Sequence, residues 1–318
     1  MTALNKTVDA LKTGKTFLIA AHEGPDGDAL ASTLALANAL REMGKDAVAY
    51  NVDGVPEKLR FLPGSERVVS CLASDQRFDV GVILDAGEIR RARVDARERC
   101  DLLVNIDHHP CSEDFGDLYL VDDEASATGA MIYRVLKAAG HPISQPVAEC
   151  IYTAILSDTG SFRYSSANPE AFAIAGEMVA CGVDPWEIAG GLYESQEAER
   201  LQLLALTLAT LKVSECGRIA AVTTTTQMFD QIGVGAEYAD SFVNYPRSIH
   251  GVEVALFFRQ LAPERFKLGM RSKGRVDVGA LARELGGGGH HNAAGVELVG
   301  SLLDVQQFVF SRLQSLLS

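Results

Sequence analysis

The stretch VNIDHHP, residues 104–110, decides how this chain is organised. The apolar run from Leu102 to Ile106 predicts a buried strand, and the residues after it predict the loop in which that strand ends. In an α/β sheet, side chains at the carboxyl ends of strands project into the crevice where ligands bind. A solvated loop is the alternative. An aspartate and two histidines directly behind a buried strand favour a site for a divalent transition metal.

Two other apolar runs end in the same way. The run FLIAA, residues 17–21, leads into HEGPDGD, residues 22–28, and the run VGVIL, residues 80–84, leads into Asp85. A fourth candidate, Asp158, lies where a helix predicted from residue 146 comes to its end. We therefore expect these four points of the chain to converge on one site.

Taken one at a time, these residues are weak evidence. His22, Asp26 and Asp28 lie on a loop whose glycines and proline permit a tight turn, so their side chains can face one centre. An aspartate helix cap at Asp28 beside an incidental histidine explains the same segment equally well. Single acids such as Asp85 and Asp158 commonly end strands or satisfy turns. Their combination is what indicates a function.

Together the candidates are too many for one metal ion. Five carboxylates in one place would repel each other strongly unless cations lay between them. Two ions about 3.5–4 Å apart form the clamp that is used for in-line phosphoryl displacement. Mixed carboxylate and imidazole donors favour Mn²⁺ over Mg²⁺ or structural Zn²⁺. The candidates are His22, Asp26, Asp28, Asp85, Asp107, His108, His109 and Asp158.

The order of elements predicts an α/β fold. Strands and helices alternate through the first part of the chain, which predicts a mostly parallel sheet with helices on both faces. The 318 residues suffice for two domains. We predict a catalytic domain over residues 1–193, a linker over 194–213 and a smaller α/β substrate-binding domain over 214–318. A long helix over 194–211 is expected to form the linker, with four leucines at core spacing, Leu201, Leu204, Leu208 and Leu211.

The composition narrows the class of ligand. The formal net charge is −13, from 42 acidic and 29 basic residues, and no basic run occurs, which disfavours a protein that grips long duplex nucleic acid. A small anionic ligand held by a few placed bases remains compatible. No apolar run is long enough to cross a bilayer, and no signal peptide is evident. Six cysteines without paired spacing fit a reduced, cytoplasmic setting.

A glycine run near the C-terminus predicts an anion site. Residues 286–289 are all glycine and precede His290 and His291. Glycines let backbone N–H groups approach a phosphate, and arginine binds phosphate in a bidentate manner. A flexible turn is the alternative, and either histidine could be the one that meets phosphate. Arg163 could also face the crevice, although a surface arginine is equally consistent. The expected phosphate-binding residues are Arg271, Ser272, Gly287, Gly288, Gly289 and His290.

These motifs resemble those of the DHH phosphoesterase superfamily. The pattern HxxxDxD at residues 22–28 resembles its first motif, Asp85 the second, residues 107–109 the third and Asp158 the fourth. The segment GGGGHHNAAG, residues 286–295, with MRS before it at residues 270–272, resembles the glycine-rich motif of the DHH-associated C-terminal domain. Chain size, domain pair and the stretch DTGSFRY, residues 158–164, are similar to the bifunctional oligoribonuclease (nanoRNase)/pAp phosphatases.

The resemblance implies a role for each candidate. Two Mn²⁺ ions are implied, with Mg²⁺ or Co²⁺ as substitutes. His109 would contact the scissile phosphate, and Asp107 would orient a histidine. One ion would be held by His22, Asp26 and Asp85, and the other by Asp28, Asp85, His108 and Asp158, with Asp85 shared. The substrate's other phosphate would meet Arg271 and His290.

The implied activity is two-metal hydrolysis of very short RNA, including pGpG and pApA, and dephosphorylation of adenosine 3′,5′-bisphosphate. Hydrolysis of another small phosphate, a cyclic dinucleotide or pyrophosphate, is the alternative among enzymes. A nucleotide-binding sensor is the alternative outside them, although a complete ligand set argues against it. The preferred substrate length, the cleavage polarity, the preference for RNA or DNA and the oligomeric state stay open. The resemblance raises a homodimer as one option.

Overall fold

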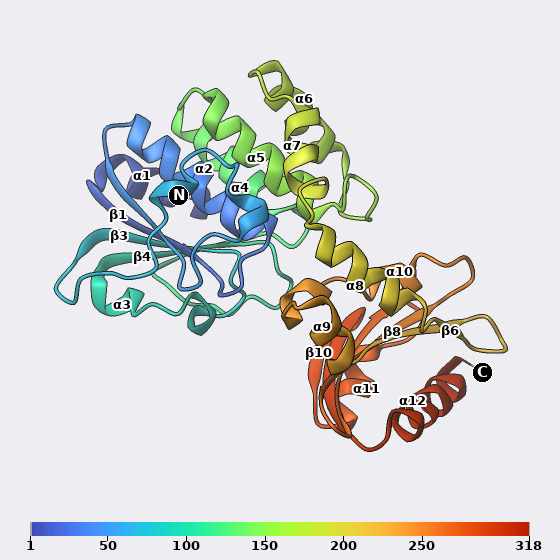
Figure 1. Ribbon diagram of the computed structural model, residues 1–318. Coiled ribbons are helices and arrows are strands. Elements are labelled where there is room, and N and C mark those ends of the chain that lie inside the picture. Colours follow the sequence, from blue (N-terminus) through green and yellow to red (C-terminus); the bar gives the residue numbers. More distant parts are fainter. Residues whose placement is uncertain (1, 318) are drawn as a thin grey trace. The chain divides into compact units, whose positions relative to one another are not determined.

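The computed structural model describes residues 2–317, which divide into two compact units, Met1–Ser195 and Gln196–Ser318 (Figure 1). Unit 1 opens with helix α1 (Ala3–Thr13), after which strands and helices alternate as the sequence predicts. Its elements up to the last strand are β1 (Thr16–Ala21), α2 (Gly27–Glu42), β2 (Asp46–Tyr50), β3 (Phe78–Leu84), α3 (Ala96–Arg99), β4 (Cys100–Asp107) and β5 (Leu118–Val121). Four longer helices follow: α4 (Thr128–Ala139), α5 (Gln145–Asp158), α6 (Pro169–Ala180) and α7 (Pro185–Tyr193).

The sheet of unit 1 is entirely parallel, in the order β2-β1-β3-β4-β5. The chain leaves β1 for β2 on one side and then returns to β3 on the other. This reversal of strand order places a ligand crevice at the carboxyl ends of β1 and β3. The α/β class and the parallel sheet predicted from the sequence are confirmed.

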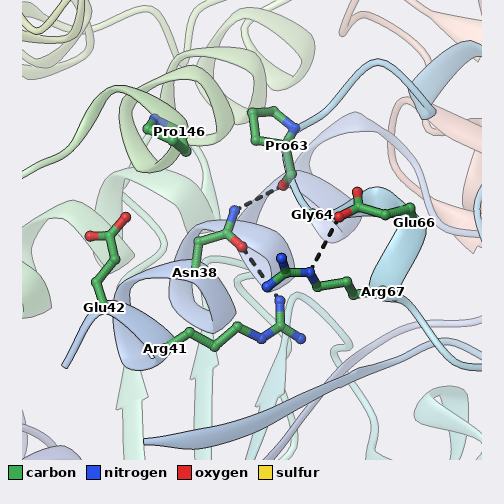
Figure 2. Close-up of a pocket in the computed structure, with 8 residues that line it drawn as sticks. All are labelled: Asn38, Arg41, Glu42, Pro63, Gly64, Glu66, Arg67 and Pro146. Carbon is green, nitrogen blue, oxygen red and sulfur yellow. Dashed lines mark hydrogen bonds and ion pairs between the residues drawn. The ribbon is translucent and has the colours of Figure 1, made fainter. Parts of the chain in front are cut away.

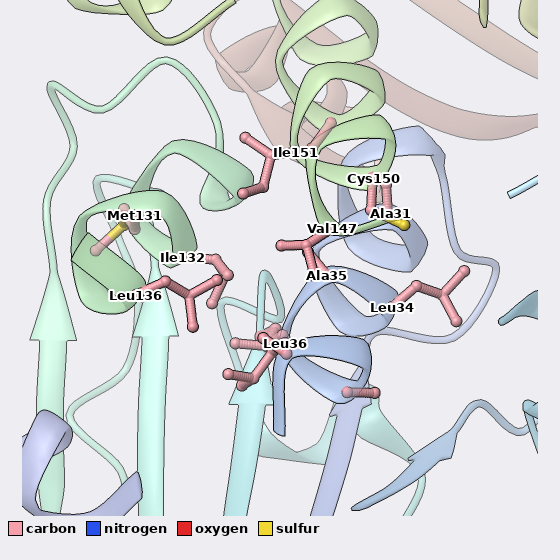
Figure 3. Packing of buried hydrophobic residues seen from close by; sticks show 14 of the residues in the cluster. Ala31, Leu34, Ala35, Leu36, Met131, Ile132, Leu136, Val147, Cys150 and Ile151 are labelled. Atoms are coloured by element: carbon pink, nitrogen blue, oxygen red, sulfur yellow. The ribbon is translucent and has the colours of Figure 1, made fainter. Parts of the chain in front are cut away.

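Both faces of this sheet are covered, but unequally. Helices α1, α2, α4 and α5 pack on one face and bury the larger cluster of apolar side chains (Figure 3). Small residues such as Ala31 and Ala35 let α2 lie close to α5, where Val147 and Ile151 are fully buried. A smaller cluster fills the opposite face beneath short helical segments.

The charged segment from Arg90 to Arg99 is not one continuous helix. It forms a 3-10 turn (Ile89–Ala92) and the four-residue α3. Arg93, which ends the turn, has a left-handed φ of 50°. The chain must bend there because Ala92 and Ala96 are both buried against the sheet.

The sheet of unit 2 is mixed, in the order β10-β11-β9-β8-β7-β6, and only β7 and β8 pair in parallel. Its strands are β6 (Lys212–Val213), β7 (Ile219–Thr224), β8 (Val254–Ala262), β9 (Arg265–Ser272), β10 (Gly288–His290) and β11 (Ala293–Val299). Its helices are α8 (Ala198–Leu208), α9 (Thr226–Ile232), α10 (Asn244–Arg247), α11 (Val278–Glu284) and α12 (Leu302–Leu317). The core lies between one face of the sheet and the helices α11 and α12.

The expected linker helix is shorter than its pattern suggested. Helix α8 begins at Ala198 and ends at Leu208, and it packs within unit 2 on residues such as Phe242. Its buried leucines are Leu203 and Leu204. Three of the four leucines assigned to core spacing, Leu201, Leu208 and Leu211, are 53%, 37% and 41% exposed. Within residues 2–317, no helix combines the length and the apolar character needed to span a bilayer.

Candidate metal centre

Three neighbouring strands bring acidic and histidine side chains to one edge of the parallel sheet. His22 follows the end of β1, Asp85 follows the end of β3, and Asp107 is the last residue of β4. Since β1, β3 and β4 are adjacent and parallel, their carboxyl ends meet at the same edge. The convergence predicted from sequence therefore follows from the strand order.

The side chains form three overlapping groups of donor atoms, each within 4.8 Å of one another. Asp85 belongs both to the group with His22 and Asp26 and to the group with His108 and His109, and His108 also belongs to the group with Asp28 and Asp158. Asp85 Oδ1 lies 3.4 Å from His108 Nε2 and 3.5 Å from His109 Nδ1. His108 Nε2 lies 3.7 Å from a carboxylate oxygen of Asp28 and of Asp158. The groups are His22–Asp26–Asp85, Asp85–His108–His109 and Asp28–His108–Asp158.

Asp85 lies at the middle of this arrangement and is held there under strain. It has a left-handed φ of 53°, a conformation that non-glycine residues adopt at a cost. Its side chain is buried and accepts a hydrogen bond from Thr128 Oγ1 at 3.1 Å. Burial, together with the negative charge of Asp28, raises the pKa of Asp85 to about 7. Such a carboxylate needs a positive partner if it is to be ionised at neutral pH.

Asp28 is fixed by the N-terminal end of α4. Its oxygens accept hydrogen bonds from the backbone N–H groups of Thr128 and Gly129, at 2.7 and 3.0 Å, and from Ser32 Oγ at 2.7 Å. Burial raises the pKa of Asp28, and the partly positive helix end offsets only part of that cost. The cap of α2 is Asp26, whose Oδ1 accepts from Ala29 N, so the alternative of a cap at Asp28 is wrong.

Two histidines present Nε2 towards the carboxylates. His22 Nδ1 lies 2.7 Å from the carbonyl oxygen of Glu23, and His108 Nδ1 lies 3.2 Å from that of Ala125. A carbonyl can only accept, so Nδ1 carries a proton in both rings and Nε2 is the nitrogen that can bind a metal ion once it is free of a proton. His22 Nε2 is 3.9 Å from Asp85 Oδ2. A backbone carbonyl behind each ring is the usual way in which a metal-binding histidine is oriented.

Asp107 binds the neighbouring His109 and is not a member of the three donor groups. It is fully buried, and it accepts hydrogen bonds from His109 Nδ1–H at 2.7 Å, from the backbone of His109 at 3.1 Å and from Gly87 N at 2.8 Å. Burial alone would raise the pKa of Asp107, but the hydrogen bonds from His109 and Ser112 outweigh it and lower the pKa to about 2. The hydrogen bond to Asp107 in turn raises the pKa of His109.

The electrostatics of the cluster fit divalent cations. Burial raises the pKa of Asp158 to about 7, with further contributions from Asp28 and Asp26. Burial alone would lower the pKa of His108, but Asp85 and Asp28 outweigh it and raise the pKa to about 10. The cluster thus takes up protons to compensate its own charge. Carboxylate and imidazole donors in this proportion match a pair of divalent metal ions.

Among the described residues, no hydrogen bond or ion pair joins Arg163 to the three donor groups. It lies in a tight turn after α5, where Gly160, Ser161 and Phe162 all have left-handed φ values. Its Nε donates to Gly160 O at 2.6 Å, and its side chain is exposed. The turn itself ends α5 directly after Asp158.

The predicted phosphate residues of unit 2 lie around a separate pocket of about 450 Å³. Arg271, Gly288 and Gly289 line it, whereas Gly287 packs against the strand β11. Ser272 is buried beside it and accepts from Gly274 N. His291 is engaged elsewhere, with Nε2 3.0 Å from Gly274 O. Among residues 2–317, the side chain of His290 is exposed and makes no hydrogen bond or ion pair, which favours it as the histidine available to a ligand.

Sequence reasoning missed several residues at both places. Thr128 and Ser32 hold the carboxylates of the cluster, and the helix start at Thr128-Gly129 was a readable signal for the first. Arg259 and Lys267 line the pocket of unit 2. Their signal was the alternation of residues along β8 and β9, which places them on the same face as Arg271.

A cavity in unit 1 lies away from the metal centre. It has a volume of about 390 Å³ and lies at the C-terminal end of α2, around Asn38, Arg41 and Arg67 (Figure 2). The ligand residues Asp26 and Asp28 are at the opposite end of the same helix. Asn38 bridges the cavity wall by donating to Pro63 O at 2.8 Å.

Comparison with known proteins identifies the two units. Residues 16–155 match the DHH family, N-terminal domain, and residues 220–315 match the DHHA1 domain. The bifunctional oligoribonuclease and PAP phosphatase NrnA of Thermus thermophilus is 34% identical over 286 residues, 90% of this chain and 85% of that protein. The protein named "probable manganese-dependent inorganic pyrophosphatase" of Bacillus licheniformis is 29% identical over 175 residues, 52% of this chain and 56% of its own.

A solved structure agrees over nearly the whole chain. The crystal structure of an exopolyphosphatase-related protein from Bacteroides fragilis has a TM-score of 0.89 at 28% identity, covering 98% of this chain and 96% of that one. Both family matches, the identity with the Thermus protein over most of both chains, and the converging acid and histidine groups lead to one conclusion. The chain belongs to the DHH phosphoesterase superfamily and carries a DHH domain followed by a DHHA1 domain.

Proposed function

We propose that this protein is a two-metal, Mn²⁺-dependent phosphoesterase that degrades very short RNA oligonucleotides and dephosphorylates adenosine 3′,5′-bisphosphate. The observation that carries the proposal is the pair of ligand groups joined through Asp85 and His108. The similarity to the Thermus oligoribonuclease and PAP phosphatase over 90% of this chain supports the substrate class. The mixed donors, and the name of the Bacillus relative, support manganese.

The chain's own residues would hold the ions in two adjoining places. His22, Asp26 and Asp85 would bind one, and Asp28, His108 and Asp158, again with Asp85, would bind the other. When bound, two divalent ions stabilise the charge that develops on the phosphoryl oxygens during in-line displacement. Asp28 and His108 are fixed by backbone groups of the segment 125–129, so their donor atoms stay in place without the ions.

His109 would act on the phosphate itself. Its Nδ1–H is bound to Asp107, which leaves Nε2 for the substrate. The ionised Asp107 keeps the pKa of His109 raised, which favours the protonated, cationic form of the ring beside the scissile group. A cation there can stabilise developing negative charge or donate a proton to the leaving oxygen.

Unit 2 would supply the preference for short substrates. Arg271, Gly288 and Gly289 offer an arginine and exposed backbone at one pocket, and the exposed imidazole of His290 follows them in the chain. These groups suit a phosphate other than the one that is cleaved, and binding energy gained there can be used to orient the reacting phosphate. Very short oligonucleotides and nucleoside bisphosphates carry such a second phosphate.

The test is a substrate panel on the purified full chain with Mn²⁺. We expect mononucleotides from 5′-phosphorylated diribonucleotides, and inorganic phosphate from adenosine 3′,5′-bisphosphate, with no activity after chelation. Hydrolysis of pyrophosphate or of cyclic dinucleotides alone would move the assignment to another small-phosphate hydrolase. Affinity for nucleotides without turnover in added Mn²⁺ would make the protein a sensor. His108→Ala, which removes a donor shared by two ligand groups, is the inactive control.

A further inference from the structure

One amide interrupts the apolar run of β4. Asn105 is fully buried on the face of the sheet where Leu103 packs into the smaller apolar cluster. Its Oδ1 has no hydrogen-bond partner among the described residues, which is unfavourable in a protein interior. An apolar side chain would fill the same place at lower cost. Packing alone therefore does not explain Asn105.

The amide group of Asn105 binds the loop that follows the strand. Its Nδ2 lies 3.1 Å from Ser112 Oγ and 3.4 Å from the carbonyl oxygen of Glu113. The carbonyl can only accept, so the NH₂ end of the amide is the end that faces this loop. Asn105 therefore donates to Ser112 Oγ, and the hydroxyl proton of Ser112 is directed to a different acceptor.

That acceptor is the carboxylate of Asp107. Asn105 and Asp107 are two residues apart on β4, so their side chains leave the same face of the sheet. The loop brings Ser112 back to them, because its backbone N–H donates to His109 O at 3.2 Å, and its hydroxyl hydrogen-bonds Asp107. Donation thus runs in one direction, from Asn105 to Ser112 and from Ser112 to Asp107.

Ser112 completes the set of hydrogen bonds that Asp107 can accept. An ionised carboxylate has about four acceptor positions. The side chain and the backbone of His109 fill two of them, at 2.7 and 3.1 Å, and Gly87 N fills a third at 2.8 Å. The hydroxyl of Ser112 fills the fourth. A carboxylate that is bound from every side is held in one orientation.

The orientation of Asp107 determines where the ring of His109 points. His109 Nδ1 lies 2.7 Å from Asp107 Oδ1 and 3.5 Å from Asp85 Oδ1, so two carboxylates compete for the same nitrogen. If Asp107 turned away, the ring could swing towards Asp85. Nε2 would then leave the position from which it is proposed to contact the phosphate.

We propose that Asn105 and Ser112 are positioning residues for His109, which they orient by fixing the carboxylate of Asp107. The inference deepens the proposed function, on which the catalytic role of His109 rests. The hydrogen bonds themselves are present in the metal-free chain, so they can be tested without turnover. Removing either group should loosen the hydrogen bond between His109 and Asp107 and leave the metal ligands in place.

Proton NMR of the full chain in EDTA observes this hydrogen bond directly. An imidazole N–H that is held by a buried carboxylate resonates far downfield of the amide protons and exchanges slowly with water. The resonance is assigned to His109 by its loss in His109→Gln. We expect its exchange to become at least about tenfold faster in Ser112→Ala and in Asn105→Leu. Ser112→Thr keeps the hydroxyl and should restore the wild-type rate.

Tyr119→Phe is the matched control for the stability of the loop. The hydroxyl of Tyr119 donates to Ser112 O at 2.9 Å, so this variant removes a hydrogen bond from the same residue without changing its side chain. The exchange of the His109 proton should equal that of the wild type. Asn105→Leu adds a second distinction, because an apolar side chain in place of an incompletely bonded amide should leave the unfolding temperature unchanged or raise it.

Steady-state kinetics with Mn²⁺ separate positioning from metal binding. We expect kcat for adenosine 3′,5′-bisphosphate to fall by about 10–100-fold in Ser112→Ala and Asn105→Leu, with KM and bound manganese as in the wild type. Ser112→Thr should recover kcat, and Tyr119→Phe should keep it.

Three results would overturn the inference: wild-type chain that lacks the downfield resonance, wild-type exchange in Ser112→Ala, or an equal increase of exchange in Tyr119→Phe. Wild-type exchange in Asn105→Leu would overturn the role of Asn105, and if that variant does not fold, Ser112→Ala decides alone. Wild-type chain that hydrolyses nothing, while the exchange results hold, would contradict the proposed function and leave the positioning of His109 standing.

Discussion

At the scale of single residues, Asp85 combines two unfavourable features. Its backbone is left-handed, and its carboxyl group is buried among other acids. Both are costly in a protein without a bound cation and are common where function requires them. Asp85 therefore lowers the stability of the metal-free protein while it provides a candidate metal ligand.

Asp85→Asn should lose activity and gain stability. Asparagine tolerates the left-handed backbone and carries no charge, so the metal-free variant should be more stable than wild type by on the order of 2 kcal/mol at pH 7. Both metal positions lose a ligand, so turnover should fall by at least about a thousandfold. Thermal unfolding in EDTA and a hydrolysis assay check the two halves. A variant that is both active and less stable would contradict this role for Asp85.

Asp107→Asn should affect His109 and not metal content. The neutral amide no longer holds the pKa of His109 up, so the ring loses its proton at a lower pH. We expect a rate about 10–100-fold lower and a high-pH limb of the kcat profile that moves to lower pH. Metal analysis should give the wild-type stoichiometry. An unchanged pH profile, or loss of metal, would assign Asp107 a different role.

At the scale of elements, the ligand positions depend on how closely α2, α4 and α5 pack. Gly129 in the first turn of α4 faces α5, where a Cβ atom would lie 2.4 Å from Ala154 Cβ. Its N–H also binds Asp28. The spacing of these helices and the position of a metal ligand are thus set by the same residue.

Gly129→Ala should force α4 and α5 apart. Overpacking of this kind costs about 1–3 kcal/mol, and because Asp28 moves with α4, Mn²⁺ affinity should fall as well. Gly176→Ala in α6 is the matched control, since a Cβ there meets nothing within 4 Å, and better helix propensity should stabilise it by about 0.5–1 kcal/mol. Denaturant unfolding and metal titration measure both. Equal behaviour of the two variants would show that the α4–α5 contact does not position the ligand.

How well the sequence predicted each element depended on how local its signal was. Buried parallel strands followed by acids were readable because strand, turn and ligand are adjacent in the chain. Helix α8 was misjudged because Leu201 and Leu204 also fit a core spacing, and only the fold of unit 2 selects Leu203 and Leu204. Arg259 was missed because its proximity to Lys267 and Arg271 arises from strand pairing, which has no local signature, whereas the alternation of residues along β9 was a readable signal for Lys267.

At the scale of the whole molecule, the cluster links stability to pH and to metal. In the metal-free protein the pKa values of Asp85 and Asp158 are raised to about 7 from 3.8, so the folded chain holds protons that the unfolded chain has released between those values. The pKa of His108 is raised to about 10 from 6.5, so its stabilising contribution fades above pH 6.5. Stability falls with rising pH wherever the folded state binds more protons.

The metal-free protein should therefore unfold at progressively lower temperature as the pH rises from 5 to 8. Mn²⁺ replaces those protons, so the increase in unfolding temperature that it causes should grow over the same range. Scanning calorimetry in EDTA and in Mn²⁺ at each pH gives the difference. A metal-induced shift that is constant or shrinks with pH would mean that these groups are not the ligands.

The most direct test of the two-metal account is anomalous diffraction at the manganese edge from crystals of this protein grown with Mn²⁺. The account predicts two peaks about 3.5–4 Å apart, with Asp85 between them, His22 and Asp26 on one ion, and Asp28, His108 and Asp158 on the other. A single ion, or manganese bound away from these side chains, would contradict it.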